Sequence, residues 1–105
     1  YGCPPMSKVR ENKFFDQIQR ASIDIHKLRN YGSAALDFAY VASGRADFAW
    51  YEHLKYWDYA AGKIILLEAG GTISDFTGKS FDKKNETYIS NSLIHDQVHK
   101  ILFKN

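Results

Sequence analysis

Two stretches of the chain carry apolar residues on nearly every side, which is the pattern of helices buried between layers of a fold. Residues 33–43 include a single charged residue, Asp37, and residues 58–69 are mostly apolar after the first position. Gly44 follows the first stretch and Gly70 follows the second, and glycine commonly ends a helix. We therefore predict two buried helices, each of which needs neighbours on both sides.

Other segments have the spacing of surface helices or short strands. Amphipathic spacing predicts a helix over residues 8–20, capped by Ser7, and a last helix that starts after Asn91 or Ser92. Alternating or aromatic runs predict strands at 22–28, 47–51, 72–76 and 88–90, with a turn at Thr77 and Gly78. Strands that alternate with buried helices indicate an α/β fold of helix–sheet–helix layers. A length of 105 residues allows one domain, which we place at 1–105.

Charge and composition exclude several classes of protein. The chain has 14 Lys and Arg against 12 Asp and Glu, and the basic residues are scattered, so we expect no nucleic-acid surface. No apolar run is long enough to span a bilayer, so we expect no membrane partner either. Cys3 is the only cysteine and no secretory signal is visible, which together predict a cytoplasmic protein.

Asp58 puts a carboxylate at the start of an apolar helix. At the N-cap position, which we predict for it, one oxygen accepts from the first free amides of the helix, and the second oxygen stays available to a cation. An ordinary cap without a metal is the alternative, and spacing alone favours it.

The turn before the first buried helix is a second candidate site. Gly32, Ser33 and Ala34 stand where free backbone amides and a hydroxyl can bind an oxygen-rich substrate. A routine helix start is the alternative, and these residues alone do not separate the two.

The string WDYAAGKIILLEAGG, with GSAALDFAYVASGRADFAWYE upstream, resembles the carboxy-terminal signature of the inositol monophosphatase family. These are Mg²⁺-dependent, lithium-sensitive phosphomonoesterases, and the resemblance runs from about Arg29 to Thr77. Because family members are much longer, the resemblance implies that this chain corresponds to their carboxy-terminal portion, within the layered sugar-phosphatase fold.

The resemblance also implies roles for single residues. Asp58 matches a Mg²⁺ ligand, Gly32, Ser33 and Ala34 match a segment beside the substrate's hydroxyl groups, and Glu52 matches a glutamate that contacts the polyol. The family takes its other ligands from an earlier glutamate and a DPxDGT-type motif, neither of which is in this chain. We therefore assign no catalytic residue here and expect the 105 residues alone to be inactive.

For the whole enzyme, the resemblance implies hydrolysis of a small phosphomonoester such as inositol monophosphate. The expected partners are a phosphorylated polyol, sugar or nucleotide and a second copy in a homodimer. The loop from Glu52 to Asp58 is one residue shorter than in typical members, which bears on the choice of alcohol. A non-catalytic binding or interaction module that keeps the same fold is the alternative.

The histidines do not add a metal site to this reading. His95 and His99 are four residues apart in the last helix but lack the glutamate of a zinc-protease helix. We expect both side chains on a solvated face.

Overall fold

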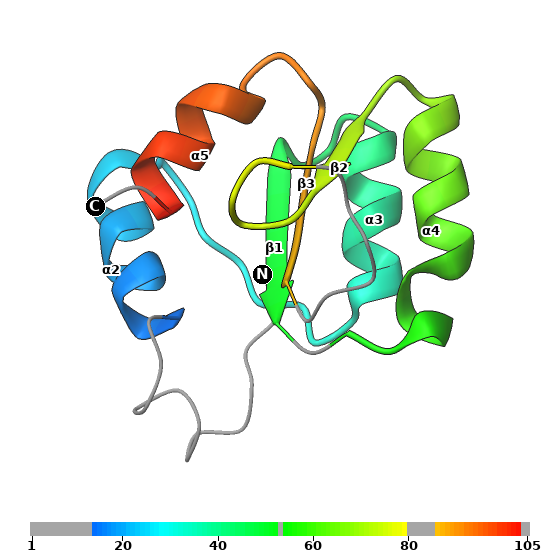
Figure 1. The fold of residues 1–105 in the computed structure, drawn as a ribbon, viewed down its shortest axis with the longest axis horizontal. Coiled ribbons are helices and arrows are strands. Elements are labelled where there is room, and N and C mark those ends of the chain that lie inside the picture. The colour runs from blue at the N-terminus through cyan, green and yellow to red at the C-terminus, as the bar shows by residue number, and fades with distance from the viewer. Residues whose placement is uncertain (1–13, 53, 80–85, 104–105) are drawn as a thin grey trace.

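A three-stranded sheet lies between two pairs of helices, α2 with α5 on one face and α3 with α4 on the other (Figure 1). This computed structural model describes residues 14–52, 54–79 and 86–103. The elements in chain order are α2 (Phe14–Asp24), α3 (Ala34–Ala42), β1 (Phe48–Glu52), α4 (Tyr56–Glu68), β2 (Thr72–Ser74), β3 (Glu86–Ser90) and α5 (His95–Phe103). The predicted helix–sheet–helix layering is confirmed.

The last strand in the sequence lies in the middle of the sheet. The strand order is β1-β3-β2, and both outer strands pair antiparallel with β3, with Trp50 opposite Tyr88 and Ile73 opposite Ile89. The two outer strands therefore run in the same direction, so the chain needs a crossover between them, and α4 provides it.

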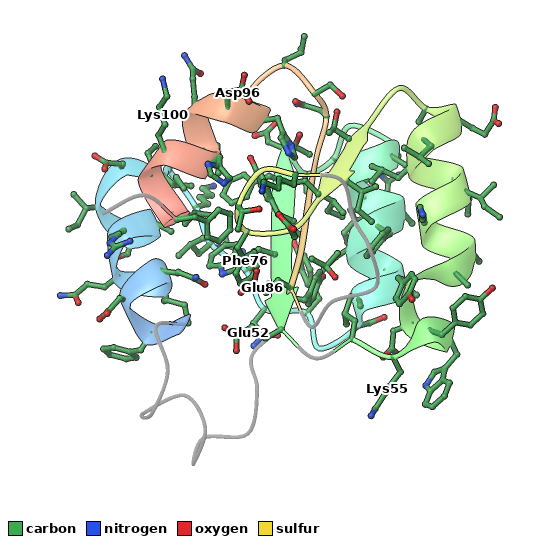
Figure 2. All side chains as sticks on the ribbon, viewed as in Figure 1. Glu52, Lys55, Phe76, Glu86, Asp96 and Lys100 are labelled. Carbon is green, nitrogen blue, oxygen red and sulfur yellow. The ribbon has the colours of Figure 1, made fainter. Side chains whose placement is uncertain are left out.

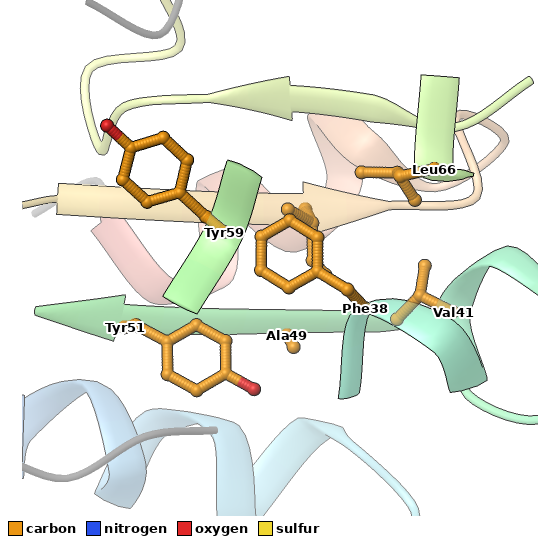
Figure 3. Packing of buried hydrophobic residues seen from close by; sticks show 7 residues of the cluster. Phe38, Val41, Ala49, Tyr51, Tyr59 and Leu66 are labelled. Atoms are coloured by element: carbon orange, nitrogen blue, oxygen red, sulfur yellow. The ribbon is translucent and has the colours of Figure 1, made fainter. Parts of the chain in front are cut away.

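Alternation along β1 divides the buried side chains into two cores. Trp50 packs with Ala21 and Leu102 between the sheet and the α2/α5 pair. Ala49 and Tyr51 face the other way, into a core that holds Phe38 of α3 and Tyr59 and Leu66 of α4. Figure 3 shows the Phe38 ring at the centre of this second core.

The region from residue 22 to residue 28 differs from the prediction, because it forms no strand. The helix that we placed at 8–20 continues as α2 to Asp24, and the Ile25 amide still donates to the carbonyl of Ala21 (2.9 Å). Ala21 is fully buried while Ile23 is 76% exposed, so the apolar residues follow helical packing and not two-residue alternation. Ser7 and residues 8–13 lie outside the described residues.

The remaining differences are in the ends of elements. The strand predicted at 72–76 ends at Ser74, because the next residues form a turn in which Asp75 Oδ1 accepts from the amides of Thr77 (2.9 Å) and Lys79 (3.1 Å). The turn at Thr77 and Gly78 is thus confirmed. The last helix begins at His95, later than the predicted caps. Within the described residues, no helix has the length and apolar character needed to cross a bilayer.

Candidate active-site edge

Helices α3 and α4 both begin at the end of the sheet where β1 finishes (Figure 1). Two contacts hold these three segments together. The hydroxyl of Tyr51, next to the end of β1, donates a hydrogen bond to Asp37 in the first turn of α3. Tyr59, near the start of α4, packs into the same core as Tyr51. The predicted site segments before α3 and α4 therefore lie at the same end of the sheet.

The turn before α3 is built as a helix start with free donors. Gly32 has a φ of +74°, which glycine adopts without strain, and its amide donates to Asn30 Oδ1 (3.1 Å). Ser33 is the N-cap, and its Oγ accepts from the Leu36 amide (3.2 Å). The amides of the first helical residues, beginning at Ala34, have no carbonyl partner within the helix. Gly32 and Ser33 are exposed and Ala34 is partly exposed, so this turn is accessible from solvent.

Asp58 is the third residue of α4 and not its N-cap, so that part of the prediction is wrong. The helix begins two residues earlier because neither Tyr56 nor Trp57 breaks it, and Lys55 takes the cap position. The Lys55 amide donates to Asp58 Oδ2 (2.9 Å), which fixes the carboxylate across the first turn. The other carboxylate oxygen of Asp58, Oδ1, can coordinate a cation.

The described residues fit Mg²⁺ as a source of one ligand. Asp58 is partly exposed and offers a hard oxygen, the donor type that Mg²⁺ prefers. No group of three or more His, Cys, Asp or Glu in the described parts of the chain is placed to hold a metal ion. A complete metal site thus needs ligands in addition to Asp58.

Glu52 is at the same end of the sheet, but its side chain is on the α2/α5 face and not on the α3/α4 face. It is the last residue of β1, pairs with Glu86 across the ladder, and lines a cavity of about 360 Å³ beside Arg20 and Phe76. Figure 2 shows Glu52 near Glu86 and Phe76, with Lys55 at the start of α4 well to the other side. The structure thus places Gly32, Ser33, Ala34, Glu52 and Asp58 at one end of the sheet, with the Glu52 side chain on the opposite face from the starts of α3 and α4.

The electrostatics of the edge favour an anion beside a cation. The N-terminus of a helix carries a partial positive charge and unpaired amides, so the starts of α3 and α4 both favour a negative group such as phosphate. Asp58 adds one negative charge at the start of α4, so its carboxylate would hold a divalent cation, which would supply charge neutralisation for a phosphate.

Sequence reasoning missed the buried pair that supports this edge. Burial, and then the hydrogen bond to Asp37, raises the pKa of Tyr51 well above its usual value, so the hydroxyl keeps its proton and remains a donor. The only available signal was that Asp37 is the single charge in an apolar helix, since such a charge needs a partner.

The two histidines of α5 are also not where we expected them. His99 is buried, and its Nε2 bonds to the carbonyl of Phe76 (2.7 Å). His95 bonds to Ser74 through Nε2 (3.0 Å) and to Ser90 through Nδ1 (2.6 Å). The expectation of a solvated face is wrong, because these side chains join α5 to the sheet.

The sequence profile of the inositol monophosphatase family matches residues 5–104. The chain belongs to this family. It is 43% identical over 91 residues to the fructose-1,6-bisphosphatase/inositol-1-monophosphatase of Thermotoga maritima, covering 86% of this chain and 34% of that protein. It is 42% identical over 77 residues to the Nus factor SuhB of Escherichia coli K12, covering 73% of this chain and 29% of that protein.

A solved structure agrees with the family assignment. The extragenic suppressor protein SuhB of Bartonella henselae superposes with a TM-score of 0.89 at 31% identity, over 99% of this chain and 40% of that one. The inositol monophosphatase fold is therefore present over the matched region. The chain spans about a third of the length of the curated relatives that it matches.

Proposed function

We propose that this chain is the carboxy-terminal α/β domain, residues 1–105, of a Mg²⁺-dependent phosphatase, and that the edge at the starts of α3 and α4 is its share of the active site. The observation that carries the proposal is that Asp58 and the start of α3 lie at the same end of the sheet. Membership of a family of phosphatases supports it.

Each group at the edge has a separate task in this proposal. Asp58 binds the metal through Oδ1 while the Lys55 amide holds Oδ2 and limits rotation of the carboxylate. The Ser33 hydroxyl and the backbone at Gly32 and Ala34 bind oxygens of the substrate. Bound Mg²⁺ supplies charge neutralisation at the phosphate and an activated water. The chain alone should be inactive, because one carboxylate cannot assemble a multi-metal site.

The proposed substrate is a phosphomonoester of a small polyol, sugar or nucleotide. The name of the Thermotoga relative gives two such compounds, fructose 1,6-bisphosphate and inositol 1-phosphate. Contact between Glu52 and the alcohol is a separate proposal, because its side chain lies on the opposite face of the sheet. The single cysteine supports a reducing compartment, and we place the protein in the cytoplasm.

A non-catalytic interaction module is the second candidate function. The observation that favours it is the name of the Escherichia coli relative, a Nus factor. Under this alternative, the edge would bind no metal.

Paramagnetic broadening separates the two candidates in the chain as it stands. Mn²⁺ prefers the same oxygen ligands as Mg²⁺ and broadens amide signals near its binding site. We expect millimolar Mn²⁺ to broaden amides at 32–35 and 55–59, and Asp58→Asn to abolish this effect. Asp96→Asn is the matched control, because Asp96 is also an exposed carboxylate in the first turn of a helix. Equal broadening in wild type and Asp58→Asn would remove Asp58 from the metal site.

A further inference from the structure

A cavity of about 410 Å³ lies along the outer edge of β1, the strand at one side of the described sheet. Phe48 and Trp50 face one side of the sheet and Ala49 the other, yet all three line the cavity, which places it at the strand's edge. Its other walls are residues 25–31 and α3 with the turn that follows this helix. This volume is in the range of small-molecule sites.

The cavity is separate from the candidate active-site edge. The described residues to which we assign roles in metal or substrate binding are not among its lining residues; these are Gly32, Ser33, Ala34, Glu52 and Asp58. A ligand in this cavity would therefore bind without occupying the proposed metal and phosphate positions.

The backbone of β1 adds polar groups to the cavity wall. The Asn91 amide donates to the carbonyl of Asp47 (3.1 Å), so these two residues form a hydrogen-bonded pair of the β1–β3 ladder. Such pairing alternates along an antiparallel strand, and the N–H and C=O of the next residue, Phe48, therefore point away from β3. Because Phe48 lines the cavity, the wall carries a backbone donor and a backbone acceptor.

Positive side chains outnumber negative ones around the cavity. The charged lining residues are Lys27, Arg29, Arg45, Asp37 and Asp47, with His26 beside them. Both carboxylates accept hydrogen bonds within the fold, Asp37 from the Tyr51 hydroxyl and Asp47 from the side-chain amide of Asn91 (3.5 Å). Lys27 and Arg45 are exposed and come from different walls. Their charges favour an anion between the two walls.

Tyr40 of α3 holds an aromatic ring and a cation of the cavity wall in place. The Tyr31 ring packs edge-on against the Tyr40 ring, with 5.4 Å between centroids, and the Arg45 guanidinium lies 6.0 Å from the Tyr40 centroid. The Tyr40 carbonyl also accepts from the Arg45 amide (2.9 Å), which fixes the turn after α3. Tyr31 is 51% exposed, so part of its ring is open to a ligand.

We propose that this cavity binds a small organic anion, a molecule with an aromatic or apolar body and a phosphate, phosphonate or carboxylate group. The body packs against Tyr31 and the apolar side chains of the wall. The anionic group binds Lys27 and Arg45, and the Phe48 amide donates to a further polar atom of the ligand. This site does not depend on the proposed phosphatase function.

Phenylphosphonate is a suitable probe, because it joins an aromatic ring to an anionic group and has no phosphate ester bond to hydrolyse. Amide NMR signals of the 105-residue chain without metal report the binding position. We expect saturable shifts at residues 25–31 and 45–49. Methylphosphonate and benzyl alcohol each carry one half of the probe's chemistry and should bind on the order of 10-fold more weakly.

Substitutions of exposed side chains locate the contact. Lys27→Gln and Arg45→Gln should each weaken phenylphosphonate binding on the order of 10-fold. Lys100→Gln is the matched control, because Lys100 is an exposed cation of α5 outside the cavity, and it should bind like wild type. Tyr31→Ser should weaken binding of phenylphosphonate but not of methylphosphonate, a difference that general damage to the fold would not produce.

Three results would overturn the inference: no saturable shifts, shifts confined to residues 32–35 and 55–59, or unchanged affinity in both Lys27→Gln and Arg45→Gln. Circular dichroism checks that each variant is folded. Asp58→Asn should bind phenylphosphonate like wild type, so loss of the proposed metal site would leave this site in place.

Discussion

The Tyr51 hydroxyl donates a hydrogen bond to the Asp37 carboxylate in the interior between β1 and α3. Both side chains are buried, with 3% exposure for Tyr51 and 5% for Asp37. Because Asp37 lies in the first turn of α3, this bond fixes the start of that helix against the end of β1. The position of the Gly32–Ala34 turn depends on it.

Tyr51→Phe should destabilise the protein by about 1–3 kcal/mol, because it removes a donor from a buried carboxylate. Urea unfolding followed by circular dichroism measures the change. Tyr56→Phe is the matched control, since Tyr56 is 65% exposed, and its unfolding midpoint should stay near that of wild type. Equal stability of the two variants would mean that the Tyr51 bond adds nothing to the fold.

Gly62→Ala should also destabilise the protein, by about 1–3 kcal/mol. A β-carbon at Gly62 would lie 2.7 Å from Cβ of Phe38, which sits close to the backbone and cannot swing away, so α3 and α4 would have to separate. This loss outweighs the gain of about 1 kcal/mol that alanine normally gives over glycine in a helix.

Ala61→Gly is the control for helix propensity, because Ala61 is exposed in the same turn. It should lose about 1 kcal/mol. If Gly62→Ala were more stable than wild type, the close approach of the two helices would not be a constraint.

The stability of the protein should fall as the pH drops below about 6.5, the ordinary pKa of histidine, because of His95. Burial lowers the pKa of His95; the nearby Asp96 opposes this shift and His99 adds to it. The Ser74 hydroxyl donates to the Asp75 carbonyl (2.9 Å), so its oxygen accepts from His95 Nε2, and Nδ1 accepts from Ser90. Neutral imidazole satisfies this arrangement, and a second ring proton does not.

Since the folded pKa is lowered, the unfolded chain takes up the proton first, and stability is lost from about pH 6.5 down to the folded pKa. Urea midpoints at pH 7.5 and 5.0 measure the loss. His95→Gln should reduce this pH dependence, whereas His26→Gln, at an exposed position, should retain it. If the urea midpoint of His95→Gln fell between pH 7.5 and 5.0 as much as that of wild type, the pH dependence would come from another group.

Glu52→Gln tests the predicted contact with the alcohol in an enzyme assembled from this chain and the rest of a relative. The substitution keeps the size but removes the charge. A polyol phosphate should lose more kcat/KM than p-nitrophenyl phosphate, by about 1–3 kcal/mol, because only the polyol offers hydroxyl groups. Unchanged activity on both substrates would agree instead with the placement of Glu52 opposite Glu86.

Local signals account for the elements that sequence reasoning located well. Ser33 caps α3 and Gly70, with a φ of +85°, follows the end of α4, so both helices were found close to their true bounds. The misses depended on contacts between distant segments. No local pattern shows that Ala21 packs into a core, so the continuation of α2 to Asp24 was missed. Likewise, no local pattern shows that His95 bonds to Ser74 of β2 and Ser90 of β3.

The central position of β3 has a consequence for how the molecule is made. Tyr88 belongs to one core and its neighbour Ile89 to the other, so this strand completes both. During translation β1, α4 and β2 leave the ribosome before β3, so the central position of the sheet, between the two outer strands, is still empty. Neither core can close until residue 90 has emerged, so the sheet must form by late insertion of a strand between two earlier ones. Folding that depends on such non-local pairing is slow, and the nascent chain exposes apolar surface in the meantime.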